Sequence, residues 1–238
     1  MMIRSLSADF LKIRKKGIWF LVFLAPIGII AMQALNFGLR FDYMKQQYAD
    51  DLWGGLITNI SFFVPISLYL GCTLIASLVA NVEHQMSSWK QLLALPISRT
   101  AVFSAKFTLC VILLSVSCIL LSLATIILGL AFGFGFSFPL IADTIKLGFF
   151  PFFAALPMLA LQLWLSLSFR NQALPVSLGV TAALVSPFAG TLSEWFPLNW
   201  PAMGYAGPNN AWFISAGLCL GFIIMFIGLV HFNRKDVD

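Results

Sequence analysis

Residues 100–132 read TAVFSAKFTLCVILLSVSCILLSLATIILGLAF, and Lys106 is the only charged side chain among them. An α-helix rises about 1.5 Å per residue and the hydrocarbon core of a bilayer is about 30 Å thick, so about 20 apolar residues can cross it. The stretch is long enough for a span with some tilt or extension. It therefore predicts a helix that crosses a membrane.

The composition of the whole chain agrees with a membrane location. Of its 238 residues, 60% are hydrophobic and only 10% are charged, whereas an ordinary soluble domain has about 25% charged residues. A soluble protein of this composition would expose large apolar patches to water. The net charge of +5 does not indicate nucleic acid as a partner, because most basic residues lie in short segments between apolar stretches. The expected surroundings are membrane lipid.

Five further stretches are predicted to span the membrane, at residues 17–36, 56–80, 147–169, 174–192 and 211–232. Pro65 is expected to kink the second span, and Pro151 and Pro157 to interrupt the fourth. The fold class is therefore all-α: a polytopic membrane protein with six transmembrane helices in one transmembrane domain, residues 1–238.

Residues 1–16 are predicted to form an amphipathic elbow helix that lies in the headgroup layer before the first span. Apolar side chains recur there at helical spacing, at Ile3, Leu6, Phe10 and Ile13. The segment is too polar for the apolar core of a cleavable signal peptide.

The distribution of basic residues predicts the orientation. Six spans place both termini on one side, and with that side inside, eleven Lys and Arg residues are cytoplasmic and three are external. Cytoplasmic segments of membrane proteins carry such an excess of positive charge. We therefore expect a multi-pass protein of the cell membrane with both termini in the cytoplasm.

The cytoplasmic loop at residues 81–99 is the most informative segment. Its apolar residues Val82, Met86, Trp89 and Leu93 are spaced to form one stripe of a short helix, while Glu83, His84, Gln85, Ser87 and Lys90 face elsewhere. Pro96 should end the helix, and Ser98 can cap the next span. Such a helix is suited to docking a soluble partner, although a merely solvated interfacial loop has the same pattern.

Two segments resemble the small six-span permease subunits of type-2 ABC exporters, of the kind found in bacteriocin, lantibiotic and bacitracin self-protection. The first has Glu83, the sequence LALPISR at residues 93–99, and Lys106 seven residues later. The second is FLKIRKK at residues 10–16, followed by Trp19 and Pro26.

The resemblance implies partners that the sequence alone does not name. These are ABC ATPase subunits, which would bind ATP and magnesium, and a second permease subunit, either identical or related. The residues implied in ATPase coupling are Glu83, His84, Gln85, Met86, Ser87, Trp89, Lys90 and Leu93. Residues 187–208 would dip back into the outer leaflet, and the exported molecule would be amphipathic or lipid-associated, with an antimicrobial peptide as one class.

The chain itself is not expected to be an enzyme or to hold a cofactor. It has no G-x-x-x-x-G-K-[ST] sequence and no H-E-x-x-H sequence. We also expect no ionisable side chain buried in the membrane, because the loops hold the carboxylates and Lys106 can extend its ammonium toward the surface. The energy must then come from a partner. A non-transporting scaffold or assembly protein remains the alternative, and an intramembrane enzyme is disfavoured.

Neutral polar and small residues lie within the spans. Asn59, Ser61 and Gln162 could line a pathway or form hydrogen bonds between helices. Gly217 and Gly221 form a G-x-x-x-G pair, with Gly228 seven residues further on, a spacing that allows close helix packing.

Overall fold

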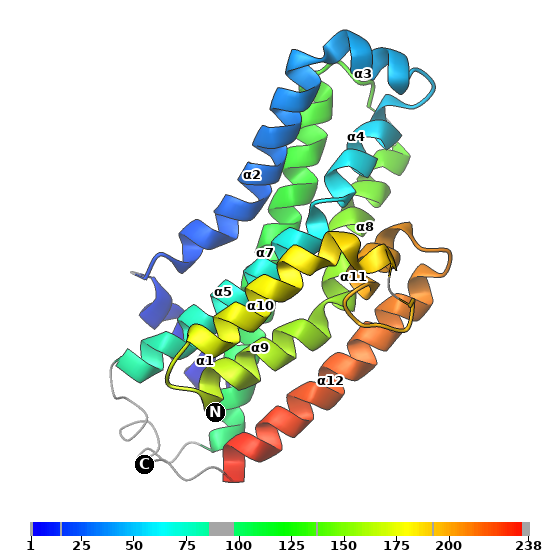
Figure 1. Ribbon diagram of the computed structural model, residues 1–238. Coiled ribbons are helices and arrows are strands. Elements are labelled where there is room, and N and C mark those ends of the chain that lie inside the picture. Colours follow the sequence, from blue (N-terminus) through cyan, green and yellow to red (C-terminus); the bar gives the residue numbers. More distant parts are fainter. Residues whose placement is uncertain (1, 15, 86–97, 137, 192, 235–238) are drawn as a thin grey trace.

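The computed structural model describes residues 2–14, 16–85, 98–136, 138–191 and 193–234, and every regular element in these ranges is a helix (Figure 1). The all-α class predicted from the apolar stretches is confirmed. Within these ranges, five helical stretches are long and apolar enough to cross a membrane, and the number is six if a bent pair of helices is counted as one span.

Three of these stretches lie in the first half of the chain. They are α2 (Ile18–Leu39), the consecutive helices α4 (Leu52–Ser61) and α5 (Val64–Gln85), and α7 (Arg99–Ala131). The others are the bent pair α8 (Phe138–Ala154) and α9 (Leu156–Ser168), then α10 (Ala173–Val185) with the 3₁₀ turn η1 (Ser186–Thr191), and α12 (Asn210–Arg234). The remaining helices of the described ranges are short: α1 (Met2–Ile13), α3 (Phe41–Gln47) and α11 (Trp200–Ala206).

The breaks in these stretches lie beside proline. Helix α5 begins at Val64, one residue before Pro65, and Pro157 lies in the first turn of α9. Proline fits a first turn because its missing N–H would have no partner there. At Ala155 the chain bends by 49° between α8 and α9. Helix α8 begins before the apolar run at residues 147–169 and includes Asp143 and Lys146, which form an exposed ion pair.

Most of the helices pack around an extended apolar core, and Ala154, Trp200 and Phe213 form a second, smaller apolar cluster. Helix α7 lies against α1, α2 and α8, while α5 lies against α9 and α10, and α12 lies against α9 (Figure 1). Tyr69, Phe37 and Phe103 are among the largest fully buried side chains. Large apolar side chains such as Phe20 of α2 and Phe226 of α12 are exposed, which is typical of surfaces that face lipid.

Two glycines allow α12 to approach the bend between α8 and α9. A Cβ atom on Gly217 would lie 2.5 Å from the Cα of Ala154, and one on Gly221 would lie 2.9 Å from the Cβ of Leu156. No side chain fits at such distances unless the backbone moves. These two glycines therefore bring α12 into close contact with the bend between α8 and α9 and fix the distance between them.

Replacing Gly217 by Leu should lower the melting temperature of the detergent-purified protein, because overpacking a well-packed contact costs about 1–3 kcal/mol or more. The matched control is Cys219→Leu, since Cys219 is exposed on the same helix. Equal melting temperatures for the two variants would contradict the close packing of α12.

Candidate functional site

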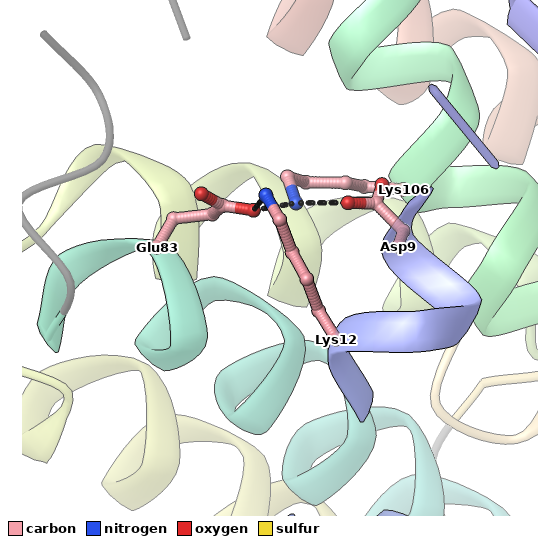
Figure 2. Close-up of polar contacts among 4 residues, drawn as sticks. All are labelled: Asp9, Lys12, Glu83 and Lys106. Atoms are coloured by element: carbon pink, nitrogen blue, oxygen red, sulfur yellow. Dashed lines mark hydrogen bonds and ion pairs between the residues drawn. The ribbon is translucent and has the colours of Figure 1, made fainter. Parts of the chain in front are cut away.

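Four charged side chains from three helices meet where α1 crosses the ends of α5 and α7. Asp9 and Lys12 come from α1, Glu83 from α5 and Lys106 from α7 (Figure 2). We call this group the ion cluster. It contains two carboxylates and two ammonium groups, so its formal charges balance when all four are ionised.

Glu83 is the hub of the ion cluster. Its Oε1 atom accepts hydrogen bonds from Lys12 Nζ at 2.8 Å and from Lys106 Nζ at 2.9 Å. Lys106 Nζ also donates to Asp9 Oδ1 at 3.3 Å. The partners are far apart in sequence, so the contacts connect α1 to both longer helices.

The ion cluster is largely shielded from solvent. The exposed fraction is 0% for the Glu83 side chain, 2% for Lys106 and 5% for Asp9, whereas Lys12 retains 29%. Apolar side chains surround it, among them Ile13, Val79 and Leu109. A charge in such surroundings is costly without a partner, so each buried group depends on the others.

Helix geometry explains why these residues meet. Asp9 and Lys12 are three positions apart and share one face of α1. Glu83 lies in the last turn of α5, and Lys106 lies two turns into α7. Helix α7 begins at a defined point because Ser98 Oγ accepts a hydrogen bond from the N–H of Ala101.

The carboxyl of Asp9 is only partly stabilised by its charged neighbours. Burial raises the pKa of its carboxyl above the ordinary value, the Lys106 ammonium opposes this rise, and the Glu83 carboxylate adds to it. Its Oδ2 atom has no hydrogen-bond partner among the described residues. The folded protein therefore holds the Asp9 proton more tightly than the unfolded chain does.

The ion cluster corrects one expectation from the sequence. We expected no buried ionisable side chain, and that Lys106 would extend its ammonium toward the surface. Instead the structure buries Lys106 and Glu83 against each other. The expectation was wrong because it treated each charge alone, whereas opposite charges on neighbouring helices remove much of the cost of burial.

Asp9 and Lys12 were not among the predicted site residues. A signal for Asp9 was present, because Asp9 lies three residues after Leu6 and four before Ile13, on the edge of the apolar face of α1. An acidic side chain at such a position needs a buried cationic partner. The identity of that partner could not be read from α1 alone.

The structure places only part of the predicted coupling segment. Glu83 is buried in the ion cluster, and the His84 ring lies 3.1 Å from the backbone oxygen of Ser166 in α9. Gln85 ends α5, and Met86, Ser87, Trp89, Lys90 and Leu93 lie outside the described residues. A coupling role for Glu83 stays a prediction, and here Glu83 would act through α1 and α7.

The other predicted polar residues occupy two separate places. Asn59 Nδ2 donates to Tyr48 Oη at 3.1 Å and to the backbone oxygen of Gly55 at 2.8 Å. Ser61 Oγ donates to the backbone oxygen of Thr58, and both Asn59 and Ser61 border one cavity. Gln162 is buried elsewhere, and neither amide atom has a partner among the described residues.

Replacing Glu83 by Gln should destabilise the protein, while Asp9→Asn should not. Removing one partner of a buried ion pair costs about 3–5 kcal/mol, and Glu83 serves two ammonium groups. For Asp9 the effect on stability has the opposite sign. Because the folded protein raises the pKa of this carboxyl, its ionisation as the pH rises above the ordinary pKa of 3.8 lowers the free energy of unfolding. Asn imitates the protonated form, so the melting temperature of Asp9→Asn at pH 7 should equal or exceed the wild-type value.

The control for these variants is Asp143→Asn. Asp143 pairs with Lys146 at 3.0 Å, but both side chains are about half exposed, so the contact should contribute little. Equal melting temperatures for Glu83→Gln and Asp143→Asn would show that the ion cluster does not hold the helices together.

Comparisons with known proteins agree with this architecture. A sequence profile described as ABC-2 family transporter protein matches residues 5–186, which include all four residues of the ion cluster. No curated protein and no solved structure matches the chain significantly. The match covers most of the chain and confirms the resemblance noted in its sequence. The chain therefore belongs to the ABC-2 transporter family, as a permease subunit of an ABC exporter.

Proposed function

We propose that this chain forms the membrane pathway of an exporter for an amphipathic or lipid-associated molecule, and that its ion cluster carries motion from a separate ATPase into the bundle. Antimicrobial peptides are one class of such molecules. A second permease subunit, identical or related, would complete the pathway. The observation that carries the proposal is the ion cluster, which joins the two helices that flank the predicted docking segment.

The position of the ion cluster suits mechanical coupling. Glu83 precedes residues 86–97 and Lys106 follows them, and the two side chains pair at 2.9 Å. An ATPase that binds residues 86–93 would pull on α5 and α7 together. Because Lys12 and Asp9 pair with the same two side chains, α1 would move with them.

Burial makes the ion cluster resistant to being pulled apart. Separating Glu83 from Lys106 would leave two charges among apolar side chains, where unpaired charges cost several kcal/mol each. Sliding the helices as one body avoids that cost. The three helices would therefore transmit force as a unit instead of shearing past one another.

Two observations support the proposed orientation: the distribution of charge and the exposed residues of α1. With the ion cluster on the cytoplasmic side, eleven of the fourteen Lys and Arg residues lie on that side. Leu11 of α1 is exposed while Ile13 is buried, so one side of α1 packs on the bundle and an apolar residue remains on the other. This suits an elbow helix in the inner headgroup layer of the cell membrane, with both termini in the cytoplasm.

Replacing Trp89 and Lys90 together by Ala should weaken ATPase binding and ATP-dependent export without lowering the melting temperature. A central aromatic contact often contributes 2 kcal/mol or more to a protein interface, so binding should weaken at least about tenfold. The measurement is the amount of ATP-hydrolysing subunit that co-purifies with the tagged chain from its native host.

Trp195→Ala is the matched control, because Trp195 is exposed in the segment before α11 and should leave ATPase binding unchanged. The scaffold alternative predicts a stable wild-type chain that never brings down an ATPase. That result, or full export by the Trp89 and Lys90 double variant, would overturn the proposed function.

A further inference from the structure

A cavity of about 340 Å³ lies where α9 and α12 end, and we call it the arginine cavity. Four described residues border it: Ser168, Phe169, His231 and Arg234. Phe232, in the same last turn of α12, packs against Phe103 of α7 with ring centroids 5.9 Å apart, and Phe103 lies one turn before Lys106. The arginine cavity is therefore at the same end of the molecule as the ion cluster (Figure 1).

The border of the arginine cavity is cationic. Arg234 is the last residue of α12 and is exposed. Its guanidinium is always charged and presents five N–H donors in a planar fork that matches phosphate or carboxylate oxygens. Within the described ranges, no Asp or Glu borders the cavity. The charge of the cavity therefore favours an anion.

The backbone oxygens at this end of the bundle do not cancel that charge. Helix ends carry partial negative charge on their last carbonyl groups, but here side chains donate to several of them. Gln172 Nε2 donates to the backbone oxygens of Ser166, at 2.9 Å, and Phe169, at 2.8 Å. Arg99 donates to the backbone oxygen of Asn233 at 3.4 Å, and so brings a second guanidinium to the end of α12.

A second donor of the arginine cavity is held in place by the contact between α9 and α12. An indole N–H can only donate, so Trp164 Nε1 donates to His231 Nδ1 at 3.2 Å. The neutral His231 ring then carries its proton on Nε2. Trp164 fits there because Gly228 has no side chain: a Cβ atom on it would lie 3.0 Å from Cγ of Trp164. The tautomer of His231 is therefore fixed before any ligand arrives.

The face of α12 that reaches the arginine cavity is also the face that meets lipid. Ile223 and Ile227 are exposed, and His231 and Arg234 follow them at spacings of four and three, which keep all four on one face of the helix. An anion with acyl chains can use the whole stripe, with its headgroup in the cavity and its chains on the two isoleucines. A free phosphate ion can use only the charged end.

We propose that the arginine cavity binds the headgroup of an anionic phospholipid. Arg234 and His231 Nε2 donate to its phosphate oxygens, and its acyl chains lie along Ile227 and Ile223. In the proposed orientation this lipid belongs to the inner leaflet, which is the anionic one, and basic pockets between helices on that side are suited to such headgroups. The inference goes beyond the proposed function and takes only the orientation from it, since binding needs neither ATP nor an ATPase.

The test is native mass spectrometry of the full chain, purified in detergent without ATPase, with dioleoylphosphatidylglycerol as the probe. We expect one tightly bound lipid. Dioleoylphosphatidylcholine should bind at least about fivefold more weakly, because its headgroup has no net charge and one basic residue at a membrane surface contributes about that factor. The soluble headgroup, glycerophosphoglycerol, should not displace the lipid at the same concentration, because it lacks the acyl chains.

Two variants test the named donors. Arg234→Gln should weaken phosphatidylglycerol binding at least about tenfold, the factor for a lost charge-assisted hydrogen bond, and His231→Phe should weaken it about fivefold. The melting temperature of lipid-free Arg234→Gln should equal that of the wild type, because Arg234 is exposed at a helix end. Arg14→Gln is the matched control: Arg14 is exposed just after α1, and its loss should weaken binding by less than about fivefold.

Equal losses for Arg234→Gln and Arg14→Gln would show only a general attraction of lipid to basic residues, and would overturn the inference. Equal affinities for the two lipids would do the same, and displacement by glycerophosphoglycerol would show an anion site that needs no lipid. If Arg234→Gln did not fold, His231→Phe and the comparison of the lipids would still decide. All of these results are obtained without an ATPase, so failure here is distinguishable from failure of the proposed function.

Discussion

Two ammonium groups share one carboxylate oxygen of Glu83, whose side chain is fully buried. The arrangement of α1, α5 and α7 depends on this interaction, because the ion cluster joins charged side chains from all three helices. Apolar packing in a membrane is weakly directional, since lipid can replace a neighbouring side chain. A buried ion pair has no such substitute, so it ties α1, α5 and α7 together in one arrangement.

Helix α5 connects the ion cluster to the cavity beside Asn59. Its last turn holds Glu83, and Pro65 in its first turn borders that cavity. In the proposed mechanism, a displacement of the ion cluster would reach the cavity through this continuous helix. At the far side, the bend at Ala155 and the close contact at Gly217 hold α12 against α8 and α9. Charged contacts therefore hold α1, α5 and α7 together next to the predicted docking segment, and apolar packing holds α12 against α8 and α9.

The sequence predicts the class of fold but not its polar contacts. Long apolar stretches such as residues 100–132 predict helices because lipid offers the backbone no hydrogen-bond partners. The pairing of Lys106 with Asp9 joins residues 97 positions apart, and helical periodicity within one segment contains no information about such a contact. Asn199 lies in a segment rich in Trp, Pro and Gly, where no periodicity shows which side chain turns inward.

The most direct test of the central claim measures whether α1 and α7 move as one body. Spin labels are placed at Leu11 of α1 and Thr100 of α7, in a chain whose exposed Cys219 is replaced by Ser. Double electron–electron resonance then measures the distance between the two labels in the complex with its ATPase. The account predicts the same distance distribution with and without ATP for the wild type, and a distribution that shifts with ATP for Glu83→Gln. A wild-type distance that changes when ATP binds, or a Glu83→Gln distribution that stays unchanged, would contradict it.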